Sequence, residues 1–266
     1  MNCTGTNLAR ARICRMKHIE KKHRIGLLVP SSNSTQEPEL LQMLPESVSL
    51  HVARLSLSRI DPDSTVSIVS ELEKESRKLA DAAVDIVVLA ATAPSTRLGK
   101  GYDAQLIRRM EEAAGKPATT AATAMLDAFA ALGVRRVALA AAWSEATNKW
   151  VAAFLESHGV GVPSQAALGV VSNNEVGRLH PDSAFELGRK VDCEDADAVF
   201  LACGNWWTAS IVESLERSIA KPVLTTNNMT VWHALKKLGV REAVSGFGRL
   251  LHDMPELPGA MPAKAA

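Results

Sequence analysis

Short apolar runs alternate with longer stretches of helical spacing along most of the chain. The apolar runs at 25–30, 85–91, 136–142 and 198–203 are typical of buried strands, and 48–55 and 166–171 also have strand character. Apolar positions near the helical period predict helices at 38–44, 63–83, 103–114, 121–132, 145–158, 181–191, 206–219 and 229–238. Strands that alternate with helices favour parallel sheets covered on both faces.

The second half of this pattern repeats the first. Ile25 and Ala91 are 66 residues apart, as are Val137 and Cys203, and a Lys-Pro pair occurs late in each half, at 116 and at 221. We therefore predict an α/β fold of two pseudo-symmetric Rossmann-like (flavodoxin-like) halves, whose parallel sheets face each other across a cleft. The expected division is a disordered basic extension at 1–23, a first half at 24–119 plus 227–252, a second half at 120–226 and a disordered tail at 253–266.

Composition narrows the class of protein. Of the 266 residues, 47% are hydrophobic, and the formal net charge is +1, so we expect a soluble globular protein that no bulk charge draws to nucleic acid. No apolar run reaches the length of a membrane span, and the N-terminus lacks the apolar core of a secretory signal; both predict a cytoplasmic protein. For the basic residues before position 25, a targeting arm, a disordered tail and a start placed too far upstream remain open.

The cysteines argue against a metal centre. Cys3, Cys14, Cys193 and Cys203 form no Cys-x-x-Cys pair and have no histidine cluster nearby at metal-ligand spacing. They predict free thiols in a reducing compartment, with neither a zinc site nor a disulfide framework.

Cys203 is the position around which the chain is organised, because it ends a buried strand directly before a predicted helix. Such a turn aims backbone N–H groups and the positive end of a helix dipole at the thiol, which favours a thiolate or an anion bound beside a thiol. A free cysteine is also commonly a small buried hydrophobe. Both interpretations stay open on this position alone.

Other candidates lie where strands end, since ligands of parallel α/β sheets bind at the carboxyl ends of strands. The pseudo-twofold places Ala91 and Thr92 opposite Cys203 and Gly204. An enediolate formed beside a carboxylate needs fixed donors and one acid near the carbon. The candidate donors are the hydroxyls of Ser32, Thr92 and Ser95, the amides of Asn33, Asn173 and Asn205, and the backbone N–H of Gly204. For the serines and the threonine, the competing interpretation is helix capping. The Trp206–Trp207 pair belongs either to the core or to the apolar wall of a pocket.

Several motifs resemble known enzymes. The stretches Ile25-Gly-Leu-Leu-Val-Pro-Ser-Ser-Asn33, Asn173-x-Glu-Val-Gly-Arg178 and Ala202-Cys-Gly-Asn205, with 221–235, resemble the maleate cis–trans isomerases. The stretch 133–140 resembles the arylmalonate decarboxylases. Both groups belong to the aspartate/glutamate racemase superfamily, and the resemblance runs from about residue 24 to 251.

The resemblance implies roles for single residues. Superfamily members with two active-site cysteines carry one in each half; Cys203 matches the second, whereas Ala91 stands at the first. The decarboxylases also lack the first cysteine and use one thiol to protonate an enediolate. By this resemblance Thr92 and Gly204, together with Ser32 and Asn33, hold one carboxylate, and the other lies against apolar side chains such as Trp206.

The chain departs from both patterns. It has Ala93 where the decarboxylases have serine, and Trp143, with one N–H, where they have tyrosine. It has Trp207 where the isomerases often have arginine.

The resulting hypothesis is a cofactor-independent enzyme without a metal that decarboxylates a small malonate-type carboxylate, with Cys203 as proton donor. A maleate-type cis–trans isomerase and a non-catalytic carboxylate-binding protein are the alternatives. Racemisation by two bases is disfavoured because Ala91 cannot move a proton. The expected partner is a small carboxylate or dicarboxylate; the sequence leaves open whether the chain forms a homo-oligomer.

Overall fold

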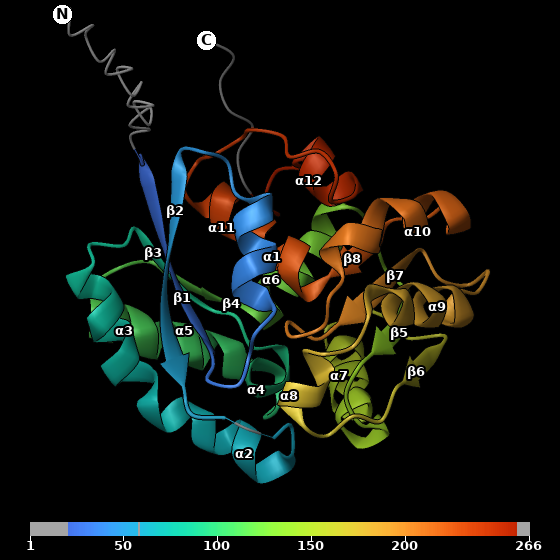
Figure 1. The fold of residues 1–266 in the computed structure, drawn as a ribbon, viewed down its shortest axis with the longest axis horizontal. Coiled ribbons are helices and arrows are strands. Elements are labelled where there is room, and N and C mark those ends of the chain that lie inside the picture. Colours follow the sequence, from blue (N-terminus) through green and yellow to red (C-terminus); the bar gives the residue numbers. More distant parts are fainter. Residues whose placement is uncertain (1–20, 58, 260–266) are drawn as a thin grey trace, which may run out of the picture.

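Two four-stranded parallel sheets form the centre of the protein (Figure 1). The computed structural model describes residues 21–57 and 59–259, so most of the basic extension lies outside the described residues. The first sheet has the order β2 (Val48–Leu55), β1 (His23–Pro30), β3 (Ile86–Leu89) and β4 (Ala118–Thr120). The second has the order β6 (Gln165–Ala167), β5 (Val137–Ala141), β7 (Ala198–Ala202) and β8 (Val223–Thr225). The two orders are equivalent, which confirms the predicted pair of α/β halves.

The repeat extends to single hydrogen bonds. The Asp85 amide donates to the carbonyl of Arg24 at 2.8 Å, and the Arg24 amide donates to the Asp85 carboxylate at 2.8 Å. Asp197 and Arg136 form the same reciprocal pair, with both distances again 2.8 Å. Asp85 therefore connects the residue before β3 to the start of β1, and Asp197 connects the residue before β7 to the start of β5.

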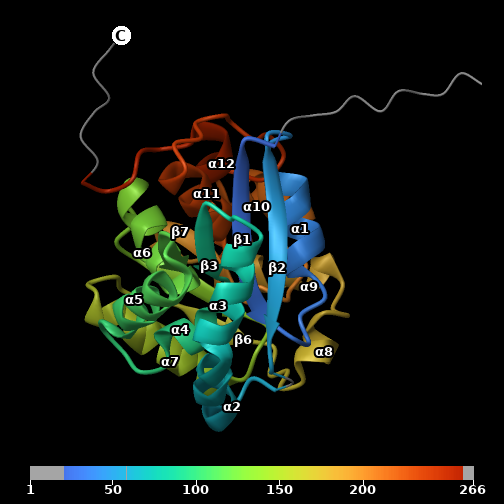
Figure 2. The same ribbon diagram turned by 90° about the vertical axis from the view of Figure 1, so that its left-hand side faces the viewer.

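Helices cover the sheets from outside and join them inside. On the outer face of the first sheet lie α3 (Leu72–Asp81) and α5 (Tyr102–Ala114) (Figure 2). The second sheet is covered from outside by α9 (Pro181–Val191) and α10 (Val212–Ile219). The helix α7 (Glu145–Ser157) also packs against this sheet and contacts residues 92–96 of the first half. Within the described chain, no helix has the length and apolar character that crossing a membrane requires.

The helix α11 (Thr226–Lys237) joins the two halves. It contacts α1 (Gln36–Met43), α6 (Ala121–Ala131) and β3 on one side, and β7 and β8 on the other. Almost every residue along it is buried. One continuous apolar core contains side chains from both sheets, for example Leu27 and Leu139, and from α11, for example Leu235. The two halves are therefore packed together through a shared core.

Several elements differ from the expected ranges. The predicted helix at 63–83 is broken into α2 (Pro62–Ser67), the 3₁₀ turn η1 (Ile68–Glu71) and α3. The helix expected from 206 starts only with the 3₁₀ turn η2 (Ala209–Ile211), and the strand expected to reach 171 ends at Ala167. Three short helices were not predicted: α4 (Thr92–Thr96), α8 (Asn173–Val176) and α12 (Arg249–Asp253).

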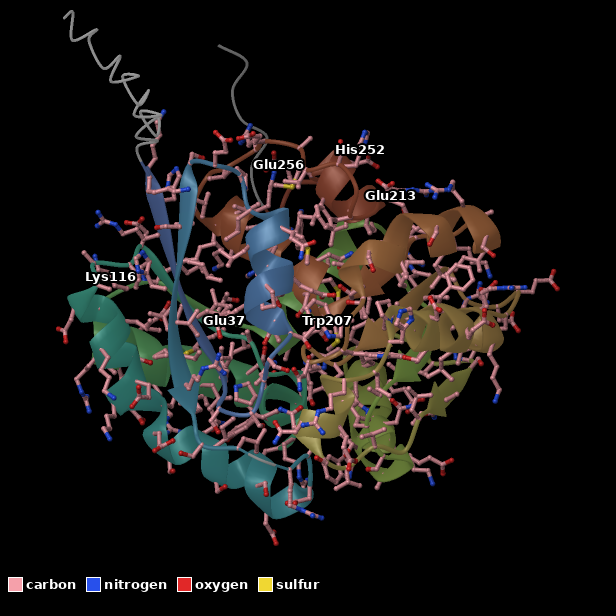
Figure 3. All side chains as sticks on the ribbon, viewed as in Figure 1. Glu37, Lys116, Trp207, Glu213, His252 and Glu256 are labelled. Atoms are coloured by element: carbon pink, nitrogen blue, oxygen red, sulfur yellow. The ribbon has the colours of Figure 1, made fainter. Side chains whose placement is uncertain are left out.

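The segment 254–256, after α12, packs against α11, whereas the sequence predicts a disordered tail from residue 253. The Lys236 ammonium donates to the carbonyl of Met254 at 3.2 Å and lies 2.9 Å from the Glu256 carboxylate (Figure 3). The Trp232 indole donates to the carbonyl of Pro255 at 3.1 Å. The prediction is wrong for 254–256 because α11 supplies these donors; residues 260–266 lie outside the described chain.

Candidate active site

A pocket between the two halves collects the carboxyl ends of β1, β3 and β7. It encloses about 350 Å³ of empty space, including space open to solvent. The lining residues are Pro30, Asn33, Leu57, Ile60, Ala90, Ala91, Thr92, Ala93, Pro94, Asn173, Cys203, Gly204 and Asn205. Six of the ten predicted site residues are among them. The other four, Ser32, Ser95, Trp143 and Trp206, are described by the structure but do not line this pocket.

Cys203 directly follows β7 and is 5% exposed. Its φ of +142° is unusual for a residue with a side chain, and its backbone N–H donates to Thr226 Oγ1 at 3.2 Å. Burial raises the pKa of the thiol to about 12, although the backbone N–H groups of Asn205 and Trp206 lower it. Desolvation outweighs these donors, and the helix expected directly after Cys203 begins only with η2. Of the two alternatives that the sequence left open, the structure therefore favours an anion beside a protonated thiol over a thiolate.

Ala91 and Thr92 form the opposite wall. Ala91 is the second residue after β3, Cys203 is the first residue after β7, and both line the same pocket. The Thr92 hydroxyl lies 3.0 Å from that of Thr226. Ser95 is turned away, because its hydroxyl donates to the carbonyls of Ala91 at 2.8 Å and Thr92 at 3.1 Å. The pocket thus holds one thiol, with a methyl group at the equivalent position.

Three side chains predicted for the site link the halves in one hydrogen-bonded series. The Asn205 side-chain oxygen accepts the backbone N–H of Ser34 at 2.9 Å, and its amide donates to the Asn173 carbonyl at 2.6 Å. The Asn173 amide donates to the Ser32 hydroxyl at 2.8 Å, and that hydroxyl donates to the carbonyl of Leu57. The series fixes the loop after β1 against the second half.

Asn33 has a capping role as well as a place in the lining. Its side-chain oxygen accepts the backbone N–H groups of Thr35 at 3.1 Å and Gln36 at 2.9 Å, at the start of α1. Its amide donates to the Gln36 side chain at 3.1 Å. These bonds fix the orientation of the Asn33 amide at the pocket wall.

The family model for arylmalonate decarboxylase matches residues 25–251. The chain belongs to the arylmalonate decarboxylase family. It is 27% identical to a maleate isomerase from Geobacillus stearothermophilus over 245 residues, which cover 87% of this chain and 98% of the relative. It is 28% identical to an arylmalonate decarboxylase from Bordetella bronchiseptica over 232 residues, 86% of this chain and 96% of that protein.

A solved relative has the same fold. It is a cysteine-to-serine variant of the maleate cis–trans isomerase of Nocardia farcinica with a covalently bound succinylcysteine intermediate. The two structures superpose with a TM-score of 0.83 at 29% identity, over 87% of this chain and 98% of the other. The chain is therefore an enzyme of a family whose named members include decarboxylases and isomerases.

In this member of the arylmalonate decarboxylase family, the tryptophans support the core instead of facing the pocket. The Trp143 indole donates to Asn148 at 3.2 Å, and the Trp206 indole donates to the Ser183 hydroxyl at 3.0 Å. Trp207 lies at the junction of the halves (Figure 3), where it donates to the carbonyl of Gly177 at 3.0 Å. The apolar wall expected from Trp206 is formed by other residues.

Leu57 and Ile60, together with Pro30 and Pro94, contribute apolar side chains to that wall, and sequence reasoning missed them. Each of the two is 6% exposed. The Ile60 backbone N–H donates to the carbonyl of Val171 at 3.2 Å, so this loop of the first half crosses to the second. An apolar pair three residues apart just after the predicted strand at 48–55 was the only sequence signal.

A second missed feature is a buried carboxylate behind the turn at 203–205. Glu39 of α1 is 1% exposed, and it accepts the backbone N–H groups of Thr208 at 2.6 Å and Ala209 at 2.8 Å. The Asn227 amide donates to the same carboxylate at 2.6 Å and to the carbonyl of Gly204 at 3.2 Å. Burial raises the pKa of Glu39, and these donors oppose the rise. No group of three His, Cys, Asp or Glu side chains in the described chain is arranged to hold a metal ion.

Proposed function

We propose that the enzyme decarboxylates a small malonate-type carboxylate and that Cys203 protonates the enediolate. One observation carries this proposal: the pocket holds a single, buried thiol opposite Ala91. Because burial raises the pKa of Cys203 to about 12, the group is a thiol at neutral pH. A protonated thiol is suited to give a proton to a strongly basic carbanion.

The proposed reaction has two steps. The bond from the α-carbon to one carboxylate breaks, carbon dioxide leaves, and the electron pair becomes an enediolate on the remaining carboxylate. The Cys203 proton then moves to the α-carbon, and the resulting thiolate regains a proton from water. In this proposal no cofactor takes part.

The lining supports different environments for the two carboxylates. Thr92 and Asn33 present a hydroxyl and an amide, and Gly204 presents backbone, so these residues are suited to hold the carboxylate that becomes the enediolate. Leu57 and Ile60 offer no polar side-chain atoms to the other carboxylate. All thirteen residues named as lining the pocket are uncharged, so loss of a poorly solvated carboxylate as carbon dioxide is favoured.

Isomerisation of a maleate-type dicarboxylate is the second candidate. The maleate isomerase relatives favour it, and the Nocardia farcinica enzyme carries a covalent succinylcysteine. A covalent route needs a cysteine thiolate, whose fraction changes about tenfold for each pH unit below the pKa. The rate of such a route should therefore rise steeply above neutral pH, whereas proton donation by Cys203 should not.

The test is to incubate the protein in deuterium oxide with aryl- and alkylmalonates and, separately, with maleate, and to record proton NMR spectra. We expect a monoacid with one deuterium at the α-carbon and a rate that changes little from pH 7 to pH 9. Fumarate from maleate, without any monoacid from the malonates, would favour isomerisation and contradict the proposal.

A further inference from the structure

Thr226 contacts both walls of the pocket without lining it. It is the first residue of α11 and is 3% exposed. Its hydroxyl oxygen accepts the backbone N–H of Cys203 at 3.2 Å and lies 3.0 Å from the hydroxyl oxygen of Thr92. A single side chain therefore joins the residue that carries the thiol to a hydroxyl of the opposite half.

Donor and acceptor rules give these contacts a direction. The N–H of Cys203 can only donate, so Thr226 accepts there and keeps its own proton. When Thr226 donates that proton to Thr92, the proton of Thr92 is free for an anion in the pocket. Three donors then point the same way, from Cys203 through Thr226 and Thr92 to the ligand, and each polarises the next.

The backbone of Cys203 needs this support. A φ of +142° is rarely adopted by residues with a side chain and persists only where neighbouring groups hold it. The following residue has no room for a side chain, because a Cβ on Gly204 would lie 2.5 Å from the Gln36 side-chain nitrogen. Thr226 therefore accepts the backbone N–H of Cys203, and Gln36 occupies the space beside Gly204.

The pseudo-symmetry of the fold supplies an independent comparison. Thr120 and Thr225 each cap the helix that follows the last strand of their half, α6 and α11. The residue after the cap is Ala121 in the first half and Thr226 in the second. The half with Ala91 thus has an alanine where the half with Cys203 has a hydroxyl.

From these contacts we propose that Thr226 is a positioning residue: it holds the Cys203 turn and directs the Thr92 hydroxyl toward a substrate carboxylate. The turnover part of this inference rests on the proposed decarboxylase function. The binding part does not, because it concerns only a carboxylate in the pocket and the reactivity of one thiol.

The test compares Thr226→Val with Thr226→Ser, which keeps the hydroxyl, and with Thr230→Val. Thr230 is buried on the same helix, and its hydroxyl donates to the carbonyl of Thr226 at 2.7 Å, so this control also removes a buried hydroxyl from α11. Two quantities are measured for each variant. The first is kcat and KM on a malonate that the wild type converts. The second is the phenylacetate concentration that half-protects Cys203 from iodoacetamide, read by peptide mass spectrometry.

For Thr226→Val we expect kcat/KM to fall about 10- to 100-fold and the half-protecting concentration to rise. Thr226→Ser should restore both quantities, and Thr230→Val should resemble the wild type. If Thr226→Val does not fold, Thr226→Ala takes its place. Protection and turnover equal to those of Thr230→Val would overturn the proposal, as would a folded Thr226→Ser that fails to restore them. If the wild type converts no malonate, the proposed function fails, while the protection measurement still decides the role of Thr226.

Discussion

Burial raises the pKa of two acidic groups near the turn at Cys203. Cys203 and Glu39 both have a raised pKa, and in each case desolvation outweighs several hydrogen bonds to the ionised form. The consequences differ. The thiol of Cys203 lines the pocket and can give its proton to a substrate, whereas Glu39 lies behind the turn and holds Thr208 and Asn227 in place.

Replacing Glu39 with glutamine should destabilise the protein. The variant places an NH₂ group among donors that now converge on a carboxylate, so we expect the free energy of unfolding to fall by about 1–3 kcal/mol. Urea denaturation followed by tryptophan fluorescence measures the change. The matched control is Glu37→Gln on the exposed side of the same helix (Figure 3), where an ion pair with Arg54 contributes about 0–1 kcal/mol. Equal losses in the two variants would count against the role of Glu39.

The same comparison has a pH dependence. Because burial raises the pKa of Glu39 above 4.5, the folded protein binds this proton more tightly than the unfolded chain. The stability linked to the proton is complete below pH 4.5 and is lost as the pH rises through the raised pKa. The stability advantage of the wild type over Glu39→Gln should therefore be larger near pH 5 than near pH 8.

At the scale of elements, the apolar pattern predicted the architecture well. The strands are short buried runs, and the recurrence of the 66-residue spacing from Ile25 to Ala91 and from Val137 to Cys203 predicted two equal sheets. Where the helix after Cys203 begins could not be predicted. Glu39, more than 160 residues earlier in the chain, binds the N–H groups of Thr208 and Ala209 at the start of η2, and such a contact leaves no local pattern.

Of the ten predicted site residues, six line the pocket. Residues near strand ends, such as Thr92 and Gly204, lie in the pocket because parallel strands bring their carboxyl ends together. Trp143 and Trp206 were misplaced because large aromatic side chains fill the core as readily as they line a pocket. Thr226 was missed because it acts through the backbone N–H of Cys203, which no side-chain motif marks.

At the scale of the whole molecule, the two similar halves provide one buried thiol, Cys203, and an alanine, Ala91, at the counterpart position. Ala91→Cys places a second thiol on the wall opposite Cys203. We expect the variant to exchange the α-hydrogen of an arylpropionate with solvent about 10²- to 10⁴-fold faster than the wild type, since a second acid–base group is then present. Deuterium uptake by NMR measures it, and Ala91→Ser controls for size. Exchange no faster than in Ala91→Ser would contradict the facing arrangement of the halves.

The measurement that tests the central claim most directly is turnover of a malonate by Cys203→Ala beside the wild type, followed as monoacid carrying one α-deuterium. An unchanged circular dichroism spectrum is the control that the variant folds. If Cys203 is the proton donor, kcat of the folded variant should be about 10²- to 10⁴-fold lower than that of the wild type. Wild-type turnover by the folded Cys203→Ala protein would contradict the account.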